Sequence, residues 1–175
     1  SAATLRKAHA THPIAAVQTE YSLWTRNPEI AVLQACKDLG VAFVAFSPVA
    51  RGFLCGPMDV SAFDDKDIRR SMPRFAPDHY AANLKLLTAY NTLAKEAGCS
   101  PSQLALAWLL ARGEHIIPIP GTTRVEHLMD DLGAADVKLG TDVMARLDAL
   151  INEKTVVGER YNAQGTSEVD TENFV

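Results

Sequence analysis

The predicted fold depends on the stretch Ile116-Ile117-Pro118-Ile119-Pro120-Gly121-Thr122-Thr123-Arg124, which runs on into a helical pattern from Val125 to Asp131. The stretch is a short apolar run that ends in Pro-Gly and is followed by small hydroxyl residues and an arginine. A strand, a tight turn and a helix N-terminus together bind anions, because free N–H groups and the positive end of the helix dipole face the ligand. We therefore predict a phosphate-binding turn here.

Two more apolar runs precede this one. Residues 41–46 are apolar throughout, rich in β-branched and aromatic side chains, and lead into Ser47-Pro48-Val49-Ala50-Arg51-Gly52. Such a run predicts a strand buried on both faces, as in a parallel sheet. Residues 14–18 form another short apolar run, which ends in the polar residues Gln18, Glu20 and Tyr21. Because each run is followed by a helical pattern, the order predicts a parallel sheet with helices outside it.

Helix signals fill most of the remaining sequence. Helices are predicted over residues 1–10 with Ser1 as a cap, 28–39 with Asn27 as the N-cap and Gly40 as the stop, 83–97, 100–109, 125–132, and from a Thr141 cap onward. Ser100 and Gln103 form a capping-box pattern. The glycine- and proline-rich residues 50–80 are expected to form a long loop with room for a short helical piece, and such loops are usually functional. Residues 158–175 are polar and are expected to form an extended, partly disordered tail.

Composition narrows the class of protein. The chain has 175 residues, of which 47% are hydrophobic and 22% charged, as expected for one globular domain with a sizeable core. A net charge of −4 disfavours a nucleic-acid partner, and no apolar run is long enough to span a membrane. The three cysteines are odd in number and lack the spacing of metal ligands. We expect reduced thiols, a cytoplasmic location and no metal site.

The chemistry is expected just beyond the carboxyl ends of the strands, where parallel α/β folds place their working residues. The side chains there include an amide, an aromatic ring, hydroxyls, glycines, an arginine and two carboxylates. They suit a ligand that carries a carboxamide, a flat ring, a phosphate and an adenine. Because none of these clusters offers a general base with a partner, no catalytic residue is predicted within this chain.

Each of these residues has an ordinary structural explanation when it is taken singly. Gln18 could simply be a hydrogen-bonding residue at a strand end, Phe46 a core residue and Arg124 a solvated surface charge. Asp130 and Asp131 could form the polar face of a helix. The functional interpretation rests on three polar strand ends occurring in the right order.

The motifs resemble those of the aldo-keto reductases. The stretch 41–52 is similar to the seventh-strand motif of that family, 117–124 to the eighth, and Gln18-Thr19-Glu20-Tyr21-Ser22-Leu23-Trp24 to the sixth, in the wording of bacterial and plant reductases that read EYSLW. The resemblance extends to about Tyr161. It implies an α/β fold: the C-terminal half of a TIM (β/α)8 barrel, with about three parallel strands and flanking helices over 1–157, followed by the tail 158–175.

The resemblance also implies a function, the reduction of aldehydes or ketones by hydride transfer from NADP(H). By motif, Gln18 would bind the nicotinamide carboxamide and Phe46 would stack on the nicotinamide ring. The implied pyrophosphate contacts are Ser47, Pro48, Val49, Gly52 and Leu54. The implied 2′-phosphate contacts are Gly121, Thr122, Thr123 and Arg124, and the implied adenosine contacts are His127, Asp130 and Asp131. The loop 50–80 would fold over cofactor and substrate.

The sequence departs from the family pattern in three ways. Phe46 stands where Tyr is usual, and Asp131 where Asn is usual. The family's catalytic Asp, Tyr, Lys and His belong to the first half of the barrel, which this sequence does not include, so the chain alone is expected to be inactive. A full barrel has eight strands and about 250 residues.

Two other functions stay open on the sequence alone. The chain could be a non-catalytic fragment that associates with itself, or a nucleotide-sensing subunit of the same fold. The expected partners are NADPH and a small carbonyl substrate. Since three parallel strands cannot close a barrel, the missing N-terminal half or a symmetric copy would have to cover the open edges.

Overall fold

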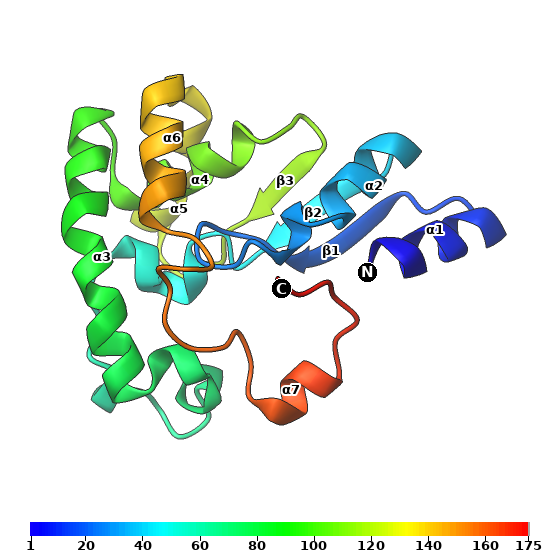
Figure 1. Ribbon diagram of the computed structural model, residues 1–175. Helices are drawn as coiled ribbons and strands as arrows, with labels where there is room; N and C mark the ends of the chain where they lie inside the picture. Colours follow the sequence, from blue (N-terminus) through cyan, green and yellow to red (C-terminus); the bar gives the residue numbers. More distant parts are fainter. Residues whose placement is uncertain (175) are drawn as a thin grey trace.

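The computed structural model describes residues 1–174, and a parallel sheet lies at its centre (Figure 1). The strands β1 (Ala16–Glu20), β2 (Ala42–Phe46) and β3 (Ile116–Ile119) adjoin in the order β1-β2-β3. Glu20 pairs with Phe46, and Phe46 with Ile119, so the three carboxyl ends lie in one row. This confirms the three predicted parallel strands and brings the polar strand ends to the same edge.

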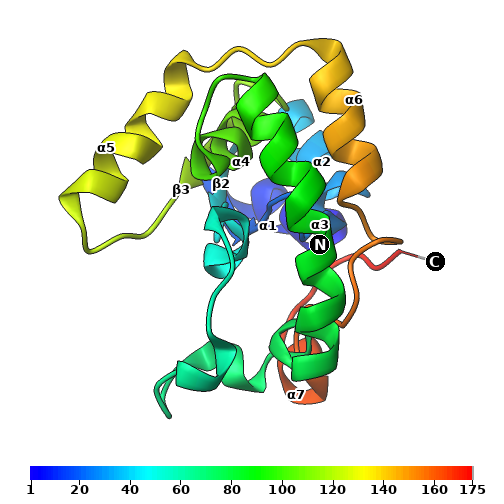
Figure 2. The same cartoon turned by 90° about the vertical axis from the view of Figure 1, so that its left-hand side faces the viewer.

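Seven α-helices accompany the sheet. They are α1 (Ala2–Thr11), α2 (Val32–Leu39), α3 (Pro77–Glu96), α4 (Pro101–Leu110), α5 (Val125–Gly133), α6 (Thr141–Leu150) and α7 (Ala163–Ser167) within the described residues. Among residues 1–174, none of these helices has both the length and the apolar character that a bilayer crossing needs. Helix α4 is buried along most of its length because it packs against β3, α3 and α5. Figure 2 shows α5 at the edge of the molecule, and none of the residues Val125–Gly133 is buried.

Within residues 1–174, one face of the sheet is covered and the other is largely open. Phe43 and Ala45 are fully buried on that face, whereas Val44 and Phe46, on the other face, are only partly buried. Ile117 and Ile119 of β3 are 49% and 41% exposed. The prediction that residues 41–46 are buried on both faces is therefore wrong, because no layer of the described residues packs on the second face.

Local capping signals predicted several helix ends. Ser100 and Gln103 form the capping box that starts α4, and Gly40 ends α2 in the left-handed conformation, with φ 66°. Three predicted ends were wrong. Helix α3 begins at Pro77 and not at residue 83, because Pro77 occupies the first helical position that proline favours. Asn27 starts a 3-10 turn without capping it, and the N-cap of α6 is Gly140, with Thr141 as the first helical residue.

The loop 50–80 is more structured than predicted. It contains four 3-10 turns, Ala50–Cys55, Val60–Ala62, Ile68–Ser71 and Pro73–Phe75, and its last residues, from Pro77, belong to α3. Aromatic contacts fix it to the body. Phe53 stacks on Trp24 with ring centroids 4.2 Å apart, and Phe75 meets the same indole edge-on at 5.4 Å.

The C-terminal tail also differs from the expectation of an extended, partly disordered segment. It contains α7 and then returns to α1 (Figure 1). The Ala2 N–H donates to Glu172 Oε1 at 2.7 Å, and Asn27 Nδ2 donates to the Glu172 carbonyl at 2.9 Å. Polar residues that cannot join the core thus fix the tail through hydrogen bonds. The division of the chain at residue 157 stays a prediction.

Candidate cofactor-binding site

A pocket of about 840 Å3 opens at the carboxyl ends of β2 and β3. The turns after both strands, the start of α4 and the loop 50–80 form its walls. Most of the predicted site residues line it, namely Phe46, Ser47, Pro48, Val49, Gly52, Gly121, Thr122, His127, Asp130 and Asp131. The structure therefore brings the two predicted phosphate turns together around one cavity.

The turn after β2 has an unusual backbone. Ser47, Ala50 and Arg51 have φ values of 51°, 54° and 56°, although none of them is glycine. The left-handed conformation costs about 1–2 kcal/mol for such residues, and strain of this kind concentrates at binding and active sites. Gly52 follows with φ 93°, and a Cβ there would lie 3.3 Å from Met58 Sδ. The turn is thus shaped at some energetic cost and lies against the wall of the pocket.

The turn after β3 presents free backbone donors. Within residues 1–174, the N–H groups of Gly121, Thr122 and Thr123 donate no hydrogen bond, whereas the Arg124 N–H donates to Thr122 Oγ1 at 3.1 Å. Helix α5 begins at Val125 without a side-chain cap from the described residues. Unpaired N–H groups that lead into a helix N-terminus favour an anion in this position.

Four predicted site residues lie outside the pocket wall. Gln18 is on the open face of the sheet, where it pairs with Val44. It lies two rows before the strand ends, because β1 runs to Glu20 and does not end at residue 18 as predicted. Leu54 is fully buried, and its N–H donates to the Val49 carbonyl at 3.3 Å, so it supports the turn from behind. Thr123 and Arg124 are exposed, and Arg124 Nε lies 3.2 Å from Glu126 Oε2.

The two acidic residues of α5 have different surroundings. Asp130 Oδ2 accepts from Ser100 Oγ at 2.7 Å and also from Ser102 Oγ, which ties α5 to the start of α4. Asp131 has no such partner among the described residues. Burial raises its pKa, the charge of Asp130 raises it further, and His127 opposes them. This end of the pocket is therefore more acidic than an asparagine at position 131 would make it.

Arg51 lies beside the predicted stacking ring. Its guanidinium carbon is 5.8 Å from the centroid of Phe46, and its Nη2 donates to Glu20 Oε2 at 3.0 Å. Both side chains of this pair are largely buried, with 14% and 6% exposure. Because Glu20 fixes Arg51, it also fixes the cation next to the ring.

Some lining residues were missed from the sequence. They are Cys55, Gly56, Pro57, Met58, Ile68, Arg69, Ser100, Pro101 and Ser102. The Gly56-Pro57 turn was a usable signal for the first part of this group. Ser100 was recognised only as a helix cap, since nothing local indicates that α4 starts at the pocket.

Parallel strands with outer helices and a pocket at the strand ends place the chain among the parallel α/β folds, which include the α/β barrels. A model of the aldo/keto reductase family matches residues 1–152. The chain belongs to the aldo/keto reductase family.

Two solved structures place the chain within that fold. One is the crystal structure of the thermostable aldo-keto reductase Tm1743 in complex with the inhibitor epalrestat. Its sequence is 30% identical to this chain, and the match has a TM-score of 0.60 and covers 83% of this chain and 44% of the reductase. A glycerol dehydrogenase from Gluconobacter oxydans is 22% identical with a TM-score of 0.75 over 88% of this chain and 47% of its own. The chain spans less than half the length of either protein. Its three strands correspond to part of a (β/α)8 barrel, as predicted.

Proposed function

We propose that the chain supplies the cofactor-binding part of an NADP(H)-dependent aldo-keto reductase that reduces aldehydes or ketones. Membership of the family supports an oxidoreductase. The observation that carries the finer proposal is the pocket of about 840 Å3, because it joins the turn after β2 to the turn after β3.

The residues present fit a dinucleotide. The free N–H groups of Gly121, Thr122 and Thr123 suit a phosphate, and a Cβ at Gly121 would meet no described atom within 4 Å, which leaves the backbone open to close approach. The ring of Phe46 lines the same pocket. The volume falls within the roughly 300–1,000 Å3 that ligand pockets usually have.

The proposed contacts follow the family motifs. Ser47, Pro48, Val49, Gly52 and Leu54 would hold the pyrophosphate, Leu54 indirectly through the turn. Gly121, Thr122, Thr123 and Arg124 would hold the 2′-phosphate, and His127, Asp130 and Asp131 would border the adenosine. Phe46 and Gln18 would orient the nicotinamide.

The proposal divides the chemistry between two parts of the barrel. NADPH, when bound, supplies the hydride that adds to the carbonyl carbon of the substrate. The residues of this chain bind and orient the cofactor, and the proton donor is a tyrosine outside them. NADPH-dependent carbonyl reduction by the purified 175-residue chain would contradict this division. The proposal includes a cytoplasmic location, which the three free cysteines support.

Cofactor preference provides the experiment. Tryptophan fluorescence is followed while the chain is titrated with NADPH and with NADH. We expect NADPH to bind about tenfold more tightly or better, since an arginine–phosphate bond contributes about 1.5–3 kcal/mol. Arg124→Gln should weaken NADPH binding and leave NADH binding unchanged. Arg6→Gln, on the exposed face of α1, serves as the control. Equal affinity of the wild type for both cofactors would remove the 2′-phosphate role of Thr123 and Arg124.

The open surfaces favour a second proposal, that another chain segment covers them. Ile117 and Ile119 are exposed on the uncovered face of the sheet. Helix α5 adds an apolar stripe of Val125, Leu128, Met129 and Leu132, which are 48–74% exposed. If the chain is a non-catalytic, self-associating fragment or a nucleotide-sensing subunit, a symmetric copy would cover these surfaces. If the chain is part of an enzyme, an N-terminal half-barrel would cover them. Light scattering on the purified chain distinguishes the two arrangements. A symmetric dimer gives a mass near twice 19.0 kDa, whereas a chain that pairs only with an N-terminal half-barrel stays near 19.0 kDa.

A further inference from the structure

A second, larger pocket of about 1000 Å3 lies under the C-terminal segment 153–174. Its walls come from the exit of β1, the turn before α3 and the C-terminal segment, and they include Trp24, Arg74, Arg160, Tyr161 and Phe174. Figure 1 shows this segment leaving α6, passing through α7 and returning to α1. Among the described residues, the two pockets share no lining residue, so this cavity is separate from the cofactor pocket.

Arg74 is a cation without a counter-ion in the wall of this pocket. Its guanidinium donates to three neutral oxygens: the Trp24 carbonyl, Thr25 Oγ1 at 2.9 Å and the Gly158 carbonyl at 3.1 Å. It forms no ion pair within residues 1–174. Burial lowers the pKa of Arg74 to about 10, with Glu20 opposing and Arg160 adding to the effect. A buried charge left in this state is costly unless an anion joins it.

The neighbouring charges do not supply that anion. Glu20 Oε2 already accepts from Arg51 Nη2 at 3.0 Å and from Arg160 Nε at 3.2 Å. The buried Glu20 carboxylate thus binds two guanidinium groups and also lies near the guanidinium of Arg74. Glu159 is nearby, but it is exposed at the rim of the pocket. The cluster keeps an excess of positive charge after its internal pairs are formed.

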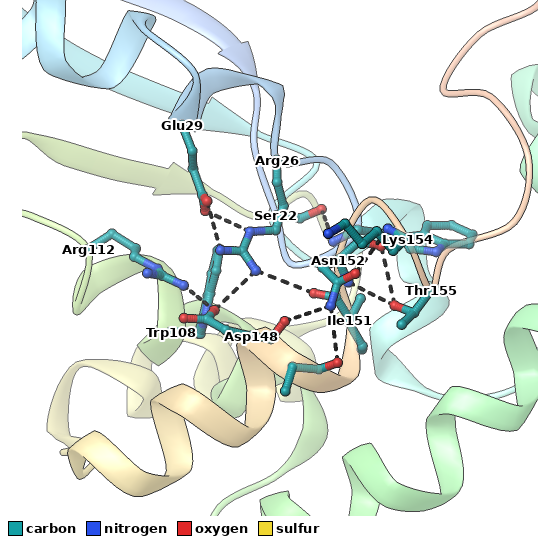
Figure 3. Close-up of polar contacts among 12 residues, drawn as sticks. Ser22, Arg26, Glu29, Trp108, Arg112, Asp148, Ile151, Asn152, Lys154 and Thr155 are labelled. Carbon is teal, nitrogen blue, oxygen red and sulfur yellow. Dashed lines mark hydrogen bonds and ion pairs between the residues drawn. The ribbon is translucent and has the colours of Figure 1, made fainter. Parts of the chain in front are cut away.

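Arg26 lines the same pocket, and unlike Arg74 it has acidic partners. Its Nη2 lies 2.7 Å from Glu29 Oε2 and its Nη1 lies 3.2 Å from Asp148 Oδ1 (Figure 3). The unpaired state of Arg74 is therefore specific to its position and does not reflect a lack of acidic residues in the region.

Trp24 adds an unused hydrogen-bond donor. Trp24 is 4% exposed and stacks on the Phe53 ring, and the Arg74 guanidinium carbon is 5.4 Å from the centroid of the indole. Within residues 1–174 its indole N–H has no acceptor. Buried donors are normally paired, and the other tryptophan obeys this rule, because Trp108 Nε1–H donates to Asp148 Oδ1 at 3.0 Å (Figure 3).

We propose that this pocket binds a small oxyanion, a carboxylate or a phosphate group, through Arg74, Arg160 and the indole N–H of Trp24. The anion neutralises the buried guanidinium and accepts the unpaired hydrogen bond. The rings of Tyr161 and Phe174 line the same cavity and provide apolar contact for the body of the ligand. This inference does not depend on the dinucleotide site.

The two indole N–H signals in a 1H–15N spectrum test the proposal without any mutation. The chain holds two tryptophans, so Trp108, already bonded to Asp148, is an internal reference. The chain is titrated with benzoate and, separately, with inorganic phosphate, at constant ionic strength and without NADPH. Trp24→Phe assigns the signals. We expect the Trp24 signal to move and saturate while that of Trp108 stays in place.

The outcomes separate the two ligand types. A response to benzoate alone assigns a carboxylate site, and a response to phosphate alone assigns a phosphate site. The proposal is overturned if neither anion moves the Trp24 signal, or if the neutral isostere benzamide moves it as far as benzoate does. A failed NADPH titration leaves this result unaffected, since no cofactor is present.

A variant then tests the role of the cation. Arg74→Gln should weaken anion binding about tenfold or more, as the loss of a charge-assisted hydrogen bond implies. Arg6→Gln, which removes an exposed arginine of α1, should leave the affinity unchanged. Unchanged affinity in a folded Arg74→Gln protein would contradict the assignment. If that variant does not fold, the wild-type titration decides by itself.

Discussion

Gly121 and Gly98 each follow a regular element, but their backbones make different demands. Gly98 has φ 70°, whereas Gly121 is outside the left-handed region and a Cβ there meets no described atom within 4 Å. We predict that Gly121→Ala leaves the free energy of unfolding unchanged and weakens NADPH binding, because the methyl group blocks the approach of a phosphate. Gly98→Ala should lower the free energy of unfolding by about 1 kcal/mol and leave NADPH binding unchanged. Urea unfolding and NADPH titration of both variants check this. Wild-type affinity in Gly121→Ala would remove this turn from the cofactor site.

Asp131 makes the end of the pocket where we propose the adenosine sensitive to pH. Its pKa is raised by burial and by Asp130, and is opposed by His127. A raised pKa in the folded state means that ionisation costs stability, so this carboxyl is favourable at low pH and becomes unfavourable as pH rises through its folded pKa. We predict that Asp131→Asn tightens NADPH binding at pH 8 by roughly two- to fivefold, as an interaction of about 0.5–1 kcal/mol implies.

Titration at several pH values checks the sign. The advantage of Asp131→Asn over the wild type should shrink as pH falls toward 4, because the wild-type carboxyl then becomes neutral as well. An advantage that stays constant over this range would contradict a role for the charge.

At the residue scale, the sequence predicted positions that depend on neighbours in the chain. Phe46 ends one apolar run, and Ser47 and Gly121 come just after apolar runs, so a strand end could be expected at each position. Leu54 could not be placed, because its burial depends on how the strained turn at Ala50 and Arg51 folds back. The partners of Glu20 could not be predicted either, because Arg160 lies in a segment that was expected to be extended and partly disordered.

At the scale of elements, α5 depends on α4 for its position. Ser100 Oγ accepts from the Gln103 N–H to cap α4 and donates to Asp130 of α5. Ser102 Oγ also donates to Asp130 and lies 3.1 Å from Ser100 Oγ, but it does not cap α4. We predict that Ser100→Ala costs about 1 kcal/mol through the lost cap and loosens α5. Ser102→Ala should loosen α5 and spare the cap. Hydrogen exchange along both helices distinguishes the variants. Equal protection of Val125–Gly133 in both variants and in the wild type would contradict the coupling.

The C-terminal segment depends on one glycine. Gly158 has φ 95°, and a Cβ there would lie 2.8 Å from His79 Nδ1 and 3.2 Å from the Arg74 backbone. We predict that Gly158→Ala costs about 1–2 kcal/mol and exposes residues 158–174 to proteases. Gly140→Ala is the matched control, since its Cβ meets no described atom within 4 Å. Limited proteolysis with mass spectrometry measures the effect, and an uncleaved segment in Gly158→Ala would count against this role of the glycine.

The start of α4 and the end of α2 at Gly40 were predicted from local signals, whereas the tail, which depends on distant partners, was not. The capping box of α4 needs only Ser100 and Gln103, so the sequence showed it. The tail needs acceptors and donors on α1, on β1 and before α3. Its composition alone therefore suggested an extended segment, although its residues are held by hydrogen bonds from far along the chain.

At the scale of the whole molecule, two pockets adjoin one charged cluster. Arg51 faces the proposed cofactor pocket, Arg74 and Arg160 face the second pocket, and Glu20 binds both Arg51 and Arg160. The barrel origin of the fold could be predicted because three motifs occur in order. The second pocket could not be predicted, because its walls come from segments that contain no motif from which their packing could be inferred.

The central claim is that a dinucleotide lies across the two turns after β2 and β3. A crystal structure of the chain with NADP+ tests it most directly. We predict the pyrophosphate between residues 47–52 and Gly121, the 2′-phosphate beside Thr123 and Arg124, and the nicotinamide against Phe46. A dinucleotide bound elsewhere, or a cofactor pocket that stays empty at saturating NADP+, would contradict it.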